Sequence, residues 1–381
     1  MKLYKYLTYL LLFLILFFPK QLDQRIIYSL AIFSVLLIPV FIKNLIKDLK
    51  EKKITTVFYL LFLISAIAST IFSIDKNSSI LQLTLFFSCF VIFVSARSIF
   101  KDFKSKDQFA LIFVLATALL SLISLYNTLV LNTVNKETDG VSFFWIYYGH
   151  NHISSLLIFS IPLCFYLLGK AFSKRAKVFM FIVSLILILS FLFSFARGSI
   201  VSFLIAFISA AILLKSTKFQ KSVKSFVVIA LVIAAIMLSV VIGAKFGVPK
   251  SPTFDSLRIQ LWQESINNFG KNVLVGSGLN TFKIVSFNTS GISLKTYFAH
   301  NHLLQMLSDA GLFGFLSTFL LMFSLLFYSL KKAKKIENQR EKLFYGAGFL
   351  GLFASIVNSM VDFNLELPAI FFIFSLIAGL L

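Results

Sequence analysis

Cysteine is almost absent from this chain of 381 residues. Only Cys89 and Cys164 occur, and both lie inside apolar stretches. Two cysteines in such positions give no disulfide framework, and their simplest interpretation is as small buried side chains. A fold held together by disulfides is therefore not expected.

Acidic residues are also scarce, with 15 Asp and Glu against 36 Lys and Arg, for a formal net charge of +21. Such an excess can mark nucleic-acid binding, but here the basic residues alternate along the chain. Of the Lys and Arg residues, 23 lie in five loops, at 43–53, 97–106, 170–177, 215–224 and 331–342. This is the positive-inside pattern of membrane proteins. It predicts that both termini are cytoplasmic, and it indicates no nucleic-acid partner.

Long polar segments are missing as well. Hydrophobic residues make up 59% of the chain, and apolar runs long enough to cross a core of about 30 Å as helices recur along it. We predict about twelve spans, at 3–18, 26–42, 54–74, 80–96, 108–130, 152–169, 178–195, 199–214, 225–243, 303–330, 343–361 and 365–381. The first lacks a small-x-small cleavage site and is interpreted as an uncleaved helix. The expected fold is all-α, a polytopic membrane helix bundle forming one integral-membrane domain over residues 1–381.

Only one connection is long, the loop 244–302 between the ninth and tenth spans, which the orientation places in the periplasm. Within it, Asp255 or Ser256 can cap a short helix that runs to Phe269, with Gly270 as its C-cap. Its apolar stripe is expected to comprise Leu257, Leu261, Ile266 and Phe269. Such a helix can lie in the membrane interface. Trp145, Tyr147 and Tyr148, in the loop 131–151, are expected to act as interfacial anchors.

Histidine is confined to two triplets, His150-Asn151-His152 and His300-Asn301-His302, each at the start of an apolar run. Histidine moves protons near neutral pH, so a reaction centre on one face of the membrane is indicated. His300 is the first candidate, as a general base that accepts a proton from a hydroxyl. The alternative is a surface histidine at a helix start.

Two arginines accompany it on the same predicted side. Arg197 interrupts the apolar stretch 178–214, where a lone arginine marks either an anionic partner or contact with lipid phosphates. Arg258 precedes Trp262 by one helical turn, so it either packs on the tryptophan or binds an anion. Together, Arg197 and Arg258 can grip one diphosphate, because two guanidinium forks match phosphate geometry.

Other chemistry has less support. Four histidines can bind zinc in principle, but positions i and i+2 of a helix diverge and no cysteine or carboxylate cluster joins them, so neither metal nor cofactor is expected. Asp309, Asp362 and Glu366 are interpreted as partners for buried arginines. The Gly276-x-Gly278 pair follows no strand and is not a nucleotide loop.

These motifs, in this order, resemble the O-antigen ligase and O-antigen polymerase superfamily of bacterial inner-membrane glycosyltransferases. Ala196 to Ser199 match its Ser-Arg-Gly turn, and Tyr148 to Asn151 match its Pro-Asn element. Arg258 with Trp262 matches its Arg-x-x-x-Trp helix, and Gly276 to Phe282 match its Gly-x-Gly-x-x-x-Phe turn. His300 to Leu303, with Asp309, Gly311 and Gly314, match its His-Asn-x-x-Leu…Glu-x-Gly-x-x-Gly signature.

The chain departs from the family pattern at several positions. Ala196 replaces a frequent serine, Asp309 replaces glutamate, and the proline common before the glycine turn is missing at 271–273. His150 replaces the usual proline, and His302 is an extra histidine. Supporting roles for His150, Asn151, Asn301, His302 and Trp262 are therefore expected at most, beside Arg197, Arg258 and His300.

The resemblance implies transfer of a glycan from undecaprenyl diphosphate to a sugar hydroxyl at the periplasmic face, without a metal and with inversion. We expect an O-antigen ligase, whose acceptor is lipid A–core. The alternative is an O-antigen or capsule polymerase with the same donor. A second alternative is a non-enzymatic transporter of lipid-linked sugars, since twelve helices and intramembrane arginines also occur there. The glycan and the oligomeric state do not follow from the residues.

Overall fold

The computed structural model describes residues 1–17, 24–129, 150–171, 173–194, 196–214, 253–290 and 298–381. Within these ranges the chain is helical and contains no strand. The expected all-α fold is confirmed.

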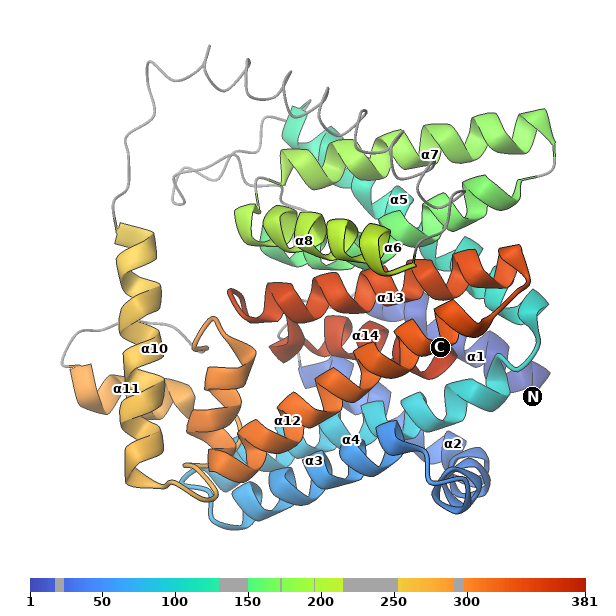
Figure 1. Ribbon diagram of the computed structural model, residues 1–381. Helices are drawn as coiled ribbons and strands as arrows, with labels where there is room; N and C mark the ends of the chain where they lie inside the picture. The colour runs from blue at the N-terminus through green and yellow to red at the C-terminus, as the bar shows by residue number, and fades with distance from the viewer. Residues whose placement is uncertain (18–23, 130–149, 172, 195, 215–252, 291–297) are drawn as a thin grey trace, which may run out of the picture.

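The described helices follow one another with short connections wherever the chain between them is also described (Figure 1). They are α1 (Lys2–Phe17), α2 (Gln24–Lys50), α3 (Ile54–Ile71), α4 (Lys76–Ile99), α5 (Phe103–Leu129), α6 (His150–Lys170), α7 (Lys174–Phe193), α8 (Arg197–Leu214), α10 (Thr253–Lys271), α11 (Phe282–Ser290), α12 (His302–Lys335), α13 (Gln339–Ser359), the 3-10 turn η1 (Asn364–Glu366) and α14 (Pro368–Leu380).

Eight of these helices are long and apolar enough to cross a membrane: α2 to α8 and α12. Helices also occupy the positions predicted for the remaining spans, with one exception. The predicted span 225–243 lies outside the described residues, as do Trp145, Tyr147 and Tyr148. The chain is therefore a polytopic helix bundle, as expected.

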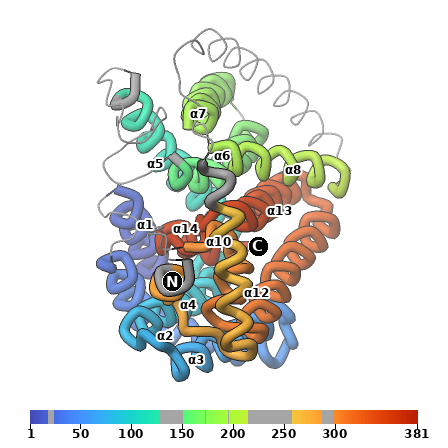
Figure 2. Tube along the Cα trace, turned by 90° about the vertical axis from the view of Figure 1, so that its left-hand side faces the viewer, coloured from blue at the N-terminus to red at the C-terminus, as the bar shows by residue number. Residues whose placement is uncertain are grey.

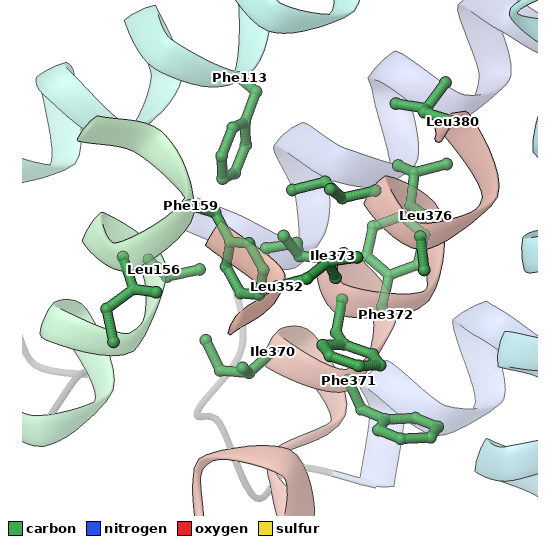
Figure 3. Close-up of a cluster of buried hydrophobic side chains, with 14 of the residues drawn as sticks. Phe113, Leu156, Phe159, Leu352, Ile370, Phe371, Phe372, Ile373, Leu376 and Leu380 are labelled. Atoms are coloured by element: carbon green, nitrogen blue, oxygen red, sulfur yellow. The ribbon is translucent and has the colours of Figure 1, made fainter. Parts of the chain in front are cut away.

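Helix α14 lies in the middle of the bundle and differs from the last predicted span. It has 13 residues, all buried, and at about 1.5 Å per residue it is too short to cross a hydrocarbon core. Figure 3 shows Ile370, Phe372 and Leu376 of α14 among side chains of neighbouring helices, including Phe159 of α6 and Leu352 of α13. This helix forms the core of the bundle instead of facing lipid.

The basic loops gather around two buried carboxylates. Asp48 is 1% exposed and accepts from Lys53, the N-cap of α3, at 2.6 Å and from Arg97 in the last turn of α4. Asp107 is paired in the same way with Lys170, whose Nζ lies 2.6 Å from Oδ2. Burying a carboxylate requires such partners, so these two residues fix the connections at this end of the bundle.

The bundle has two distinct ends (Figure 1). The terminal end comprises residues 1–5, 48–53, 97–107, 328–345 and 379–381, and both chain ends are marked there. The α10 end, opposite to it, comprises residues 196–199, 253–290, 298–310 and 358–366. Helix α10 runs roughly across the long helices of the bundle, and Figure 2 looks onto this end with α10 in front.

Helix α10 is longer than predicted, and its buried face agrees with the predicted stripe only in part. It continues through Gly270 to Lys271, so the expected C-cap at Gly270 is wrong. Among its described side chains, Leu261, Ser265 and Asn268 are buried, whereas Ile266 is 53% exposed; the side chain of Leu257 lies outside the described part. The polar Asn268 is buried because its side chain donates to both the carbonyl and the hydroxyl of Ser308. Hydrogen bonding to α12, not apolar contact alone, selects this face.

A kink in α12 locks the glycine turn in place. Gly311 has a φ of 65°, which interrupts the helix and frees carbonyl groups of the preceding turn. The backbone N–H groups of Ser277 and Gly278 donate to the carbonyls of Ser308 and Asp309, at 3.1 and 2.9 Å. Gly276 has a φ of 69°, and a Cβ there would lie 2.4 Å from the backbone of Asp309. The close approach of the turn and α12 explains Gly276 and Gly311, whose Cβ atoms would meet the backbones of Asp309 and Leu274, whereas a Cβ at Gly278 would meet Ser73.

Candidate functional site

His300 lies directly before α12, in a backbone conformation that is unusual for its type. Its φ is 53°, in the left-handed region. Asn301 follows as the N-cap of α12, where its side-chain oxygen accepts from Leu304 N at 3.1 Å. The amide of the same side chain donates to the carbonyl of Met360 at 2.8 Å. Asn301 therefore holds the start of α12 against the end of α13 and aims His300 at the segment that follows.

The His300 ring faces an aspartate and a phenylalanine of that segment. Nδ1 lies 3.4 Å from Oδ1 of Asp362, and the ring packs edge-on against Phe363 with centroids 4.7 Å apart. At that distance Nδ1 has no regular hydrogen bond within the described chain. The His300 side chain is 18% exposed and Asp362 is 7% exposed. The imidazole is thus reachable from outside while its carboxylate partner is buried.

Asp362 remains a carboxylate despite its burial. Burial alone raises the pKa of this carboxyl, but the adjacent His300 ring and the backbone N–H of Phe363, which donates at 2.9 Å, outweigh it and lower the pKa below its ordinary value. A buried carboxylate beside Nδ1 orients an imidazole and stabilises its protonated form. The pair can therefore take a proton on Nε2 and hold it.

His302 has a different environment. Its Nδ1 lies 2.5 Å from Oε1 of Glu366, and the two side chains are only 2% and 6% exposed. A pair so enclosed cannot reach an outside molecule, and it joins α12 to η1. His302 is therefore placed as a structural residue.

The first histidine triplet reaches the same segment. The ring of His152 packs edge-on against Phe363 with centroids 5.5 Å apart, and Phe363 also stacks on Phe298 at 4.9 Å. His152 and His300 thus lie on one phenylalanine, although 148 residues separate them in the sequence. The side chain of His150 lies outside the described part of the chain.

Arg197 begins α8 and is exposed at the α10 end. The next residue, Gly198, sits so close to α13 that a Cβ would lie 3.2 Å from the Val361 side chain. Val361 directly precedes Asp362, so the start of α8 and the His300 ring adjoin the same short segment. The sequence expectation that Arg197 and His300 share one end of the bundle agrees with this placement.

A buried polar network fixes the start of α8. The hydroxyl of Ser199 bonds to Ser154 at 2.8 Å and to the side-chain oxygen of Asn358 at 3.3 Å. Asn358 in turn donates to Ser155 at 3.4 Å. The carbonyl of Asn151 accepts from Ser154 and Ser155. These bonds join α6, α8 and α13, so Asn151 contributes to the scaffold through its backbone.

Arg258 approaches from α10. Leu261, one turn further along, forms a small apolar cluster with Phe282 and Ala299, and Ala299 is the neighbour of His300. Arg258 and Trp262 are half-buried. The buried Nε of Arg258 and Nε1 of Trp262 have no hydrogen-bond partner among the described residues. Burying such donors without a partner is costly.

The carboxylates do not pair with arginines, contrary to expectation. Asp362 and Glu366 contact histidines, as described above. Oδ2 of Asp309 accepts from the backbone N–H of Asn280 and from the side chain of Gln305, both at 2.8 Å. Asp309 is therefore a cap for the glycine turn. The histidines, the glycine turn and Gln305 use these acceptors, whereas Arg197 is exposed.

The described residues contain no group of three His, Cys, Asp or Glu side chains arranged to hold a metal ion. At the α10 end they place a partly exposed imidazole beside a buried carboxylate, and the same end carries Arg197 at the first turn of α8 and Arg258 on α10. Such a set can deprotonate a hydroxyl and attract a polyanion.

Sequence reasoning missed Asp362 and Phe363 as the immediate surroundings of His300. It also missed the network of Ser154, Ser199 and Asn358. Serine and asparagine in apolar helices give a weak signal, because isolated small polar residues are common there.

The comparisons with known proteins agree with this arrangement. Residues 182–319 match the family model described as O-antigen ligase, and the match includes Arg197, Arg258 and His300. No curated protein matches the chain. The matched segment contains the Arg197 turn, the α10 helix and the His300 start of α12, and it supports the similarity of this membrane-spanning chain to the O-antigen ligase and O-antigen polymerase superfamily.

Proposed function

We propose that this protein is an O-antigen ligase. In this proposal it transfers a glycan from undecaprenyl diphosphate to a sugar hydroxyl of lipid A–core at the periplasmic face of the bacterial inner membrane. The observation that carries the proposal is the His300 ring, which is partly exposed and lies 3.4 Å from the buried Asp362, whose pKa the His300 ring helps to lower. The family itself implies glycosyltransferase-like activity of the ligase or polymerase type.

In the proposed reaction, the acceptor hydroxyl gives its proton to Nε2 of His300 as its oxygen attacks the anomeric carbon of the donor glycan. The bond between that carbon and the diphosphate oxygen breaks, and the electron pair leaves with undecaprenyl diphosphate. Attack opposite the leaving group inverts the anomeric centre. Asp362 stabilises the imidazolium that forms, because it stays ionised.

The leaving diphosphate gains negative charge in the transition state, and Arg197 and Arg258 are proposed to stabilise it. Arg197 is exposed at the first turn of α8, where the positive end of the helix dipole adds to its charge. The unbonded Nε of Arg258 supplies a further donor. Preorganised cations of this kind act on developing charge without rearrangement.

The polymerase remains the closest second candidate, because donor chemistry and His300 would serve both reactions. The acceptor separates them. In a deletion strain, loss of all O-chain with accumulation of lipid-linked polymer supports the ligase. A single repeat left on the core, or a capsule defect, supports the polymerase.

A turnover measurement distinguishes a transporter from the ligase and from the polymerase. Purified protein is mixed with lipid-diphosphate glycan and acceptor, without nucleotide or ion gradient. Appearance of the glycan on the acceptor supports a transferase, whereas movement of the donor between leaflets with no new glycosidic bond would overturn the proposal. The clustering of His300, Arg197 and Arg258 at one end of the bundle, away from its middle, favours the transferase.

A further inference from the structure

A polar cavity lies at the terminal end, on the opposite side of the bundle from His300. It has a volume of about 220 Å³ and is enclosed by the start of α3, the α4–α5 connection, α12 and the end of α14. Its basic lining residues are Lys53, Arg97, Lys101, Lys106 and Lys332. The positive-inside pattern places basic residues on one side of the membrane, but it does not require five of them to line one cavity.

The positive charge of this cavity is only partly neutralised. Asp48 pairs with both Lys53 and Arg97, and Glu51 also pairs with Lys53. Lys106 and Lys332 make no ion pair with an Asp or Glu side chain within the described residues. Their excess charge remains in a partly enclosed space.

The two lysines are nevertheless held in fixed positions. Lys106 is 8% exposed and donates to the hydroxyl of Tyr345 at 2.7 Å and to the carbonyl of Leu380 at 2.8 Å. Lys332 donates to the main-chain oxygen of Leu381 at 2.5 Å. An ammonium has three donors, so each lysine keeps hydrogen-bonding capacity for an anion. Ordering cations in this way is unfavourable unless an anion completes the site.

The surroundings indicate which anion is bound. Lys53 directly precedes α3, and Tyr328 and Lys332 belong to the last turns of α12. Both helices are long and apolar enough to span a membrane. A basic cavity at the ends of such helices lies where the head groups of anionic lipids are expected.

We propose that this cavity binds the phosphate group of an anionic phospholipid, with Lys106 and Lys332 as donors to its oxygens and Arg97 and Lys101 as flanking charges. The head group then supplies the charge that Asp48 does not. The site is separate from His300 and from the proposed transfer reaction, so either proposal can fail without the other.

The test compares two double variants in lipid nanodiscs. Lys106→Gln with Lys332→Gln removes the two donors. Lys104→Gln with Lys335→Gln removes the same charge from exposed positions on the same two helices, α5 and α12, outside the cavity. Each protein is placed in phosphatidylcholine discs with and without phosphatidylglycerol. The thermal midpoint is measured, and phosphatidylglycerol that remains bound is counted by native mass spectrometry.

We expect phosphatidylglycerol to raise the midpoint of thermal unfolding of the wild type and of the Lys104/Lys335 control. We expect the Lys106/Lys332 variant to bind phosphatidylglycerol at least about tenfold more weakly than the wild type does. The measured quantity is the lipid-dependent shift within each protein, so a general loss of stability does not imitate it. Should the double variant fail to fold, Lys101→Gln, at an exposed rim position, is expected to weaken retention of the same lipid.

Three results would overturn the proposal. One is equal retention of phosphatidylglycerol by the cavity and control variants. Another is an equal midpoint shift when inorganic phosphate is added to pure phosphatidylcholine discs, because that assigns the cavity to free phosphate. The third is a wild type that does not respond to phosphatidylglycerol.

Discussion

His300 and Asp362 meet across the gap between the start of α12 and the end of α13, with Nδ1 3.4 Å from Oδ1. One ring nitrogen is turned to a buried carboxylate, which leaves the other for a substrate. Contacts of this kind are often long in resting enzymes and tighten in the transition state.

The first prediction concerns that carboxylate. Asp362→Asn keeps the shape but removes the charge that stabilises the imidazolium, so turnover should fall about tenfold to hundredfold, a part of what a general base contributes. The measurement is the rate of glycan transfer by purified protein at saturating donor.

Asp75→Asn is the matched control for this variant. Asp75 caps α4 through Ser78 and has no contact with His300. We expect a small stability change and near-normal transfer. An Asp362→Asn protein as active as this control would remove Asp362 from the mechanism.

His302 should behave differently from His300. His302→Leu leaves Glu366 buried without its partner, which should destabilise the protein by about 3–5 kcal/mol. Adding Glu366→Leu should restore part of that loss, because the unpaired charge is gone. The measurement is unfolding in detergent, with transfer by the folded fraction recorded in parallel. A double variant less stable than His302→Leu alone would contradict the structural role.

The arginines should not tolerate lysine. Arg197→Lys and Arg258→Lys keep the charge but lose the planar fork, and each should lower turnover by about tenfold or more. Arg175→Lys, on the exposed start of α7, is the control and should change nothing. Full activity in both test variants would mean that these arginines only contact lipid phosphates.

The glycine turn gives a prediction about stability. Gly276→Ala places a Cβ 2.4 Å from the Asp309 backbone at a φ of 69°, so it should destabilise the fold by about 2–4 kcal/mol. Gly270→Ala is the control, because nothing lies within 4 Å of its Cβ position. Inside α10 this alanine should be neutral or stabilising by up to about 1 kcal/mol. Unfolding midpoints of the two variants check this, and equal midpoints would refute the interlock of the turn with α12.

The sequence was sufficient for most of the spans that the structure describes but not for their surroundings. The apolar run predicted at 152–169 is the helix His150–Lys170, because hydropathy and length alone define such a segment. The same criterion misjudged 365–381, where a short buried helix is as apolar as one that faces lipid. The kink at Gly311 was not predicted, since one glycine in an apolar run carries no sign that its φ is positive.

For the site, residue type identified His300 but not its neighbours. Asp362 lies 62 residues further along, and only the packing of α12 on α13 brings them together. Charge complementarity suggested arginine partners for Asp362 and Glu366. The structure assigns them to histidines, because burial depends on the fold as a whole and is not encoded in local spacing.

The account depends most directly on proton removal by His300. Single-turnover transfer is measured for the wild type and His300→Ala, with donor binding followed separately to establish that the variant is folded. The account predicts a rate at least about 100-fold lower with donor affinity little changed. A His300→Ala protein that binds donor and transfers glycan at nearly the wild-type rate would contradict it.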